Sequence, residues 1–268
     1  MGHEDFGADS VKAGLSTRFM GRRVYFYETL PTTMDVADAK AREGAPEGTV
    51  ILADEQTAGR GRFGRSWVTP KGSTIAVSII LRPKIQEAAK LGMMVTLGVV
   101  RSLERSYGLS PRIKWPNDVL INGKKVCGIL LTSSLQGDRP EYVNAGIGIN
   151  ANLGREVLSH ISPPATSLSD ELGHPVSRLR VFTTLMEELE ELYLSIRRGA
   201  SLLPQWEPYI VTLGQQVQVQ WRREDREGYV ERGYAESVDE EGRLLLRLPG
   251  GTLKRLVAGE VTLHSQGP

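Results

Sequence analysis

The stretch EQTAGRGRFGRSW, from Glu55 to Trp67, places three glycines and three arginines in the seven residues 59–65. This alternation favours neither a helix nor a strand, because glycine weakens both and leaves no apolar face to bury. Glycine lets a backbone approach a ligand closely, and arginine supplies fixed positive charge with forked donors that suit phosphate and carboxylate groups. The stretch therefore predicts a flexible loop that binds a phosphate-containing ligand. Taken alone, a solvated surface loop is the alternative.

The loop fits neither of two common phosphate-binding motifs. It does not end in the Lys-Ser/Thr pair of a P-loop. Its glycines at 59, 61 and 64 have the GxGxxG spacing of a dinucleotide site, but Arg65-Ser66-Trp67 and a strand follow, where that motif requires a helix. We therefore expect a phosphate site of another kind.

The segments around the loop alternate between strand and helix patterns. Apolar runs predict strands at 23–30, 49–55, 73–81 and 142–150, and a hairpin-like group within 113–134. Helical spacing predicts helices at 32–43, 86–107 and 178–198. After Pro208 only short strands follow, at turn-spaced intervals, which is typical of a small β-barrel. We expect a flexible leader over 1–20, a main domain over 21–210 and a β-module over 211–268.

Composition limits the class of protein. With 33 basic and 32 acidic residues the formal net charge is +1, so any binding of polyanions must be local. The single cysteine rules out an internal disulfide, and four scattered histidines form no zinc-binding pattern. The chain has no apolar run of about 18 residues, and its beginning, MGHEDFGADS, is polar and acidic. We therefore expect a cytoplasmic protein that does not enter a membrane.

A second group of polar residues is Lys114-Trp115-Pro116-Asn117-Asp118, with Lys125 seven residues further on. A Pro-Asn-Asp turn at the end of a strand can aim two polar side chains at one point, and the Asn122-Gly123 turn can bring Lys125 back to it. A lysine beside developing negative charge and a carboxylate beside an attacking amine suit acyl or nucleotidyl transfer. A plain surface turn is the alternative for these residues taken alone.

Taken together and in order, these pieces resemble the biotin–protein ligases. The resemblance runs from about residue 22 to about residue 263, through GRGRFGRSW, KWPND, Lys125-x-x-Gly128 and the strand end GIGIN at 146–150. It implies an α+β fold, with a mixed sheet and helices like class II aminoacyl-tRNA synthetases and an SH3-like C-terminal module. The activity it implies is ATP-dependent conversion of biotin to biotinyl-5′-AMP, with Mg²⁺, followed by transfer to a lysine of a biotin carboxyl carrier domain. Members of this type are monomers or homodimers.

The resemblance also assigns roles to residues at matching positions. The implied biotin-binding residues are Thr32, Thr33, Gln56, Gly59, Arg60 and Gly128. The implied ATP- or adenylate-binding residues are Arg62, Arg65, Trp67, Asn117, Lys125 and Asn150. The implied catalytic residues are Arg62, Lys125 and Asp118, the last receiving the proton of the acceptor lysine. The residues that meet Mg²⁺ are not identified.

Two departures from the family pattern stand in the site itself. Met34 occupies the third position of Thr32-Thr33-Met34, where the family often has Ser-Thr-Asn, and Phe63 replaces a frequent arginine in the loop.

Two alternatives to a biotin ligase are considered. A lipoate–protein ligase or octanoyltransferase shares the fold group, but we do not expect it to combine GRGRxGRxW with KWPND. Some biotin ligases also act as repressors through an N-terminal DNA-binding domain of roughly 50–60 residues. About 20 residues precede the ligase pattern here, so we expect the short form, which does not bind DNA.

Overall fold

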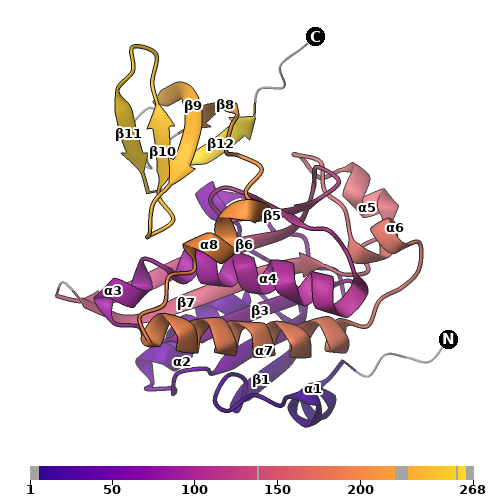
Figure 1. Ribbon diagram of the computed structural model, residues 1–268. Coiled ribbons are helices and arrows are strands. Elements are labelled where there is room, and N and C mark those ends of the chain that lie inside the picture. The colour runs from indigo at the N-terminus through magenta and orange to yellow at the C-terminus, as the bar shows by residue number, and fades with distance from the viewer. Residues whose placement is uncertain (1–5, 138, 221–228, 258, 264–268) are drawn as a thin grey trace.

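The computed structural model describes residues 6–137, 139–220, 229–257 and 259–263, and it is organised around two sheets (Figure 1). The larger sheet contains β1 (Val24–Leu30), β2 (Val50–Gln56), β3 (Thr74–Leu81), β4 (Arg112–Lys114), β5 (Asp118–Ile121), β6 (Lys124–Gln136) and β7 (Arg139–Asn150). The smaller sheet contains β8 (Gln216–Gln220), β9 (Val230–Val238), β10 (Leu244–Arg247), β11 (Leu253–Leu256) and β12 (Glu260–Leu263). The helices are α1 (Ala8–Gly14), α2 (Thr33–Arg42), α3 (Ile85–Ala88), α4 (Leu91–Tyr107), α5 (Arg155–Ser159), α6 (Leu168–Leu172), α7 (Arg178–Arg197) and α8 (Leu203–Trp206). Two short 3₁₀ turns lie at Arg62–Gly64 and Glu207–Tyr209.

The larger sheet is mixed, with the order β1-β2-β3-β7-β6-β5-β4. β1 and β2 are parallel and joined by α2, as a parallel pair requires a crossover, whereas the other neighbours are antiparallel. The long helices α4 and α7 pack together on one face, and α2 lies on the other (Figure 1). The sheet is therefore the middle layer of the main domain.

Alternation along the central strands separates the two faces chemically. In β3 the apolar residues Ile75, Val77 and Ile79 belong to the core cluster shared with α4 and α7. The residues between them, Ala76 and Ser78, are small and face the other way. The face toward α2 therefore has room for a ligand, and the face toward α4 and α7 does not.

The segment expected to be a flexible leader is folded over residues 6–20. It includes α1, and Phe6, Val11 and Leu15 are buried against the main core. The buried carboxylate of Glu190 in α7 accepts the backbone N–H groups of residues 18, 19 and 20, at 2.7, 2.8 and 3.0 Å. These apolar contacts and hydrogen bonds hold the segment, so the expectation is wrong for residues 6–20. Residues 1–5 lie outside the described chain.

The helix expected over 86–107 is divided into α3 and α4. Glu87 is the third residue of α3, and its carboxylate accepts the backbone N–H of Lys84 at 2.8 Å, which caps a single short turn. α4 then starts afresh at Leu91. Apolar spacing continued across the break, so periodicity alone could not show it.

The smaller sheet is antiparallel, with the order β11-β10-β9-β8-β12, and it encloses a small core that includes Val219, Ala235 and Leu244. It touches the main domain through the turn before β10, where the Gly242 carbonyl accepts the indole N–H of Trp115 at 2.9 Å. None of the helices in the described part of the chain is long and apolar enough to cross a membrane.

Candidate active site

A pocket opens on the α2 face of the larger sheet. Its walls come from the start of α2, the Gly/Arg loop after β2, the β4–β5 turn, the glycine-rich parts of β6 and β7, residues 161–163, and the start of β12. Segments far apart in the sequence, including one from the smaller sheet, thus meet around one cavity.

The Gly/Arg loop forms an irregular hairpin. It leaves the sheet at Gln56 and returns through a bridge from Gln56 to Thr69. Inside it, the Gly61 N–H donates to the Arg65 carbonyl at 2.7 Å, and the Trp67 N–H donates to the Gly59 carbonyl at 2.8 Å. A Cβ at Gly59 would collide with the Trp67 carbonyl, so this glycine serves the close approach of two backbone segments.

Phe63 is at the tip of the loop in a left-handed conformation, with φ 58° and ψ 34°. A residue with a bulky side chain seldom adopts this conformation. Its ring lies 4.8 Å from the guanidinium carbon of Arg62, within the range of a cation–π contact, and both residues line the pocket. Phe63 therefore supports Arg62 from the loop side.

Two facing glycines make a platform for Trp67. Gly128 of β6 and Gly148 of β7 are register partners, and a Cβ on either would collide with the indole ring. Lys125 lies over the same ring, with Nζ 5.5 Å from its centroid. Gly128 of Lys125-x-x-Gly128 and Gly148 of GIGIN are thus explained by the space that they leave for Trp67.

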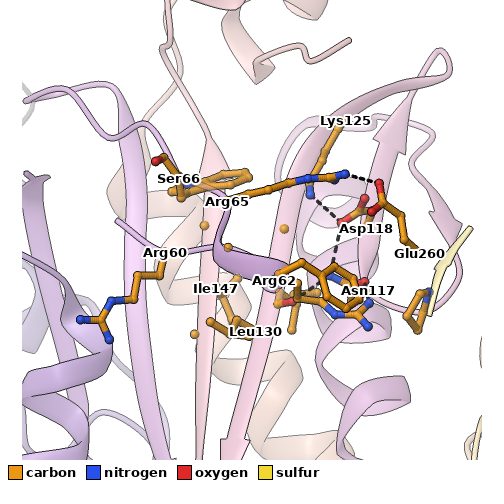
Figure 2. Close-up of a pocket in the computed structure, with 18 of the residues that line it drawn as sticks. Arg60, Arg62, Arg65, Ser66, Asn117, Asp118, Lys125, Leu130, Ile147 and Glu260 are labelled. Carbon is orange, nitrogen blue, oxygen red and sulfur yellow. Dashed lines mark hydrogen bonds and ion pairs between the residues drawn. The ribbon is translucent and has the colours of Figure 1, made fainter. Parts of the chain in front are cut away.

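Positive side chains gather at one end of the pocket, each beside an oxygen of the protein (Figure 2). Arg62 donates to Asn117 Oδ1 at 2.6 Å and to the Gly259 carbonyl at 3.3 Å. Lys125 Nζ is 2.6 Å from Asp118 Oδ1, and Arg65 pairs with Glu260 of β12. The start of the smaller sheet's last strand thus completes the charged end.

Burial affects the protonation of two of the pocket cations. Burial lowers the pKa of Arg62, with a further lowering by Arg65, while Asp118 and Glu260 act in the opposite direction. Burial also lowers the pKa of Lys114, assisted by Lys125 and Arg65 and opposed by the same two carboxylates. Positive charge in a partly dry site attracts an anion more strongly than it would in water.

The other end of the pocket is lined by neutral polar side chains, and the charge of Arg60, which also lines the pocket, is balanced there by Asp35. Gln56 Oε1 accepts the backbone N–H of Thr33 at 2.8 Å and its hydroxyl at 3.2 Å. The Ser78 hydroxyl donates to Thr33 Oγ1 at 2.8 Å. Thr32 caps α2 by accepting the Met34 N–H at 3.4 Å. The cavity therefore combines an anion-binding end with an end suited to a neutral polar group.

Most of the predicted site residues come together in this pocket. Those that line it are Thr32, Thr33, Gln56, Arg60, Arg62, Arg65, Trp67, Asn117, Asp118, Lys125 and Gly128. The guanidinium of Arg60 points away from the other cations (Figure 2) and pairs with Asp35 through two contacts of 2.8 Å.

Two predicted residues are not in the pocket wall. Gly59 packs against the Trp67 backbone, as described above. Asn150 is buried, and its Nδ2 donates to the Thr166 carbonyl at 2.9 Å. Asn150 thus holds the segment that leads back from residues 161–163, which places it behind the wall and not on its surface.

Some pocket residues were not assigned a role from the sequence. Lys114 is the first letter of KWPND, so its place in that motif was an available signal. Glu260 and residues 161–163 reach the pocket only through the tertiary fold, and no local pattern marks them.

Within the described residues, no group of three or more His, Cys, Asp or Glu side chains could hold a metal ion. Asp118 and Glu260 are instead paired with Lys125 and Arg65.

Comparisons with known proteins agree with this architecture. Residues 26–150 match the Biotin/lipoate A/B protein ligase family, and residues 212–263 match the Biotin protein ligase C terminal domain. The chain is 35% identical over 258 residues to the bifunctional ligase/repressor BirA of Bacillus subtilis, covering 94% of this chain and 78% of that protein. It is 36% identical over 230 residues to the biotin–[acetyl-CoA-carboxylase] ligase of Paracoccus denitrificans, covering 81% of this chain and 92% of that one.

Among solved structures, the biotin protein ligase from Aquifex aeolicus in complex with biotin and ATP superposes with a TM-score of 0.75 at 26% identity, over 91% of this chain and 99% of that one. The predicted α+β class with an SH3-like C-terminal domain is confirmed. The pocket, the sequence matches and the shared fold lead to one assignment: the chain belongs to the biotin protein ligase family.

Proposed function

We propose that this pocket binds biotin and ATP, forms biotinyl-5′-AMP, and transfers the biotinyl group to a lysine of a carboxylase carrier domain. The observation that carries the proposal is the pairing of a cationic end, with Arg62, Arg65 and Lys125, and an uncharged polar end in one cavity. Biotin has a neutral ureido ring at one end and a carboxylate at the other. Its ring therefore fits beside Thr33 and Gln56, and its carboxylate points toward the cations.

The first step joins two negatively charged reactants. A carboxylate oxygen of biotin attacks the α-phosphorus of ATP, the bond from that phosphorus to the bridging oxygen breaks, and pyrophosphate leaves. Arg62, Arg65 and Lys125 neutralise the charge, and because they are fixed before the reaction they need little reorganisation. The pairs that they form with Asn117, Glu260 and Asp118 hold them ready at this end of the pocket.

The second step needs a base. The amine of the acceptor lysine attacks the acyl carbon of the adenylate, the bond to the phosphate oxygen breaks, and AMP leaves with the negative charge. Asp118 lines the pocket beside Lys125 and can take the proton that the amine loses. The mixed anhydride must also be kept from water, and the Gly/Arg loop supplies the cover.

Mg²⁺ fits this site as a companion of ATP. The described residues offer no ligand cage of their own, and Mg²⁺ commonly binds through substrate phosphates with few protein carboxylates. When bound, the ion would neutralise phosphate charge; Asp118 and Glu260 are the carboxylates that line the pocket.

Two assays test the proposal. Biotin-dependent exchange of pyrophosphate into ATP reports the first step, and avidin detection of a carrier domain incubated with biotin and MgATP reports both. Absence of exchange and of labelling with several carrier domains would overturn the assignment. Excess lipoate should not compete with biotin; competition by lipoate would favour a lipoate ligase.

A substitution separates the two steps. Asp118→Asn should slow transfer about 100-fold or more, the size expected for loss of a general base. It should slow pyrophosphate exchange far less, because the asparagine Oδ1 can still accept a hydrogen bond from Lys125. Asp38→Asn, at an acid that pairs with Arg42 on α2, is the matched control and should leave both steps unchanged. Equal transfer rates for Asp118→Asn and the wild type would remove Asp118 from the mechanism.

A further inference from the structure

Asn144 of β7 is a buried amide with no hydrogen-bond partner in the described part of the chain. Its side chain is 1% exposed, and neither Oδ1 nor Nδ2 has a partner among the residues that the structure describes. Buried amides in folded proteins are nearly always paired, because an unpaired donor or acceptor has lost its contacts with water and gained nothing. A β-branched apolar residue would suit a central strand better. The contacts of the folded chain therefore do not explain this asparagine.

Asn144 shares its sheet face with the pocket. Side chains alternate along β7, so Asn144, Gly146 and Gly148 face the same way, and both glycines line the pocket. Trp67 covers Gly148, and Met34 covers Gly146, where a Cβ would lie 2.5 Å from Sδ. Asn144 is the next position along this face, about 7 Å beyond Gly146. Met34 thus lies at the border between the open pocket and the buried amide.

This border is at the uncharged end. Ser78 is the register partner of Gly146, and it begins the hydrogen-bonded series that passes through Thr33 to Gln56. Asn144 pairs in register with Ile80, the next residue on the same face of β3. It therefore lies beyond Ser78, on the side away from the cations, and is not hydrogen-bonded to that series. A ligand group that reaches it must be neutral and polar.

We propose that Asn144 determines specificity for the head ring of the acid substrate, and that Met34 moves aside to expose it. This inference rests on the proposed function, in which a ureido ring occupies the uncharged end. A ureido group has two N–H donors and one carbonyl acceptor, and an asparagine amide offers both kinds of partner. Methionine is suited to the movement because its unbranched side chain has three rotatable bonds. The site thus has a methionine at position 34 on α2 and an asparagine amide at position 144 on β7.

The first test is Asn144→Val, measured by biotin-dependent pyrophosphate exchange and by thermal unfolding. The KM for biotin should rise about two- to tenfold, the range for one neutral hydrogen bond, with kcat and the KM for ATP unchanged. Without biotin the variant should melt at the wild-type temperature or above, because the lost amide was unpaired. Its rise in melting temperature on adding biotin should be smaller than that of the wild type. Thr132→Val, at the exposed register partner on β6, is the control and should change none of these values.

The second test is Met34→Ile, alone and combined with Asn144→Val. A β-branched residue in a helix is confined to few rotamers, so Met34→Ile should raise the KM for biotin by keeping the amide covered. The double variant should be no worse than the poorer single variant, because both changes remove one contact. Additive effects would overturn the role of Met34.

The outcomes separate this inference from the function on which it rests. A wild-type KM in Asn144→Val, or a lower melting temperature without biotin, would overturn the inference while the wild type remained a biotin ligase. A wild-type protein without biotin-dependent exchange would overturn both.

Discussion

The two faces of the larger sheet use the same strands for opposite purposes. Along β7, Ala145, Ile147 and Ile149 belong to the core under α4 and α7. Gly146 and Gly148, between them, leave space that Met34 and Trp67 partly fill. The face toward α4 and α7 buries large apolar side chains, whereas the face toward α2 has glycines, whose missing side chains leave a cavity. Stability and function are thus assigned to alternate residues of one strand, so that neighbouring substitutions should have different kinds of effect.

The largest expected effect is on the core face. Ile149→Ala should lower the free energy of unfolding by about 2–5 kcal/mol, because it leaves a cavity beneath the helices. Turnover per folded molecule should change little. Denaturant unfolding and exchange assays on the same samples would check this; loss of activity without loss of stability would contradict the division between faces.

On the loop that covers the pocket face, Arg62→Ala should slow adenylate formation about 10²–10³-fold, the usual effect of removing one preorganised charged donor. The adenylate that does form should also escape, because the guanidinium that holds Asn117 and the Gly259 carbonyl is gone. Rapid quench would give the rate, and labelling of bystander lysines would report escape. An adenylate half-life equal to that of the wild type would show that the loop does not retain it.

Gly148→Ala should reduce adenylation about ten- to 100-fold, because the new methyl group would displace Trp67, and small misplacements in an active site cost rates of this order. Gly92→Ala, in α4, is a matched control, since a Cβ there meets nothing within 4 Å. It should keep full activity. If the two variants behaved alike, the platform under Trp67 would have no special role.

The smallest effect concerns pH. Burial lowers the pKa of Lys114, so this lysine loses its positive charge at a lower pH than an exposed lysine, and the KM for ATP should rise a few-fold as the pH approaches the ordinary lysine value. Because the unfolded chain binds that proton more tightly, the free energy of unfolding should rise with pH over the same interval. An arginine at this position stays charged, so in Lys114→Arg the KM for ATP should no longer rise over this pH interval. If the KM for ATP depended on pH in Lys114→Arg as it does in the wild type, Lys114 would not take part in phosphate binding.

The same alternation explains what the sequence could predict. The core-face residues of β3 and β7 are apolar at every second position or more, which made the strands recognisable, and GRGRFGRSW with KWPND identified the cationic loop and turn. The break between α3 and α4 lies at Ala89 and Lys90, and no change in the apolar spacing marks it. Glu260 enters the pocket from a strand about 140 residues beyond Asp118, so only the docking of the two sheets reveals it. Among the described residues Asn144 has no hydrogen-bond partner, and this too depends on the placement of all its neighbours, which the sequence does not show.

The environment of Trp67 has a practical consequence for spectroscopy. Trp115 and Trp206 are almost fully buried, and their indole N–H groups donate to the Gly242 carbonyl and to Thr96 Oγ1. Trp67 is partly exposed in the pocket, and its indole N–H has no partner among the described residues. Trp115 also lines the pocket but is buried, so among these three indoles Trp67 is the fluorophore whose surroundings should change most when a ligand enters. Intrinsic emission should therefore report occupancy of the pocket in the unlabelled protein, and Trp67→Phe should remove most of that signal while leaving the emission of the other tryptophans.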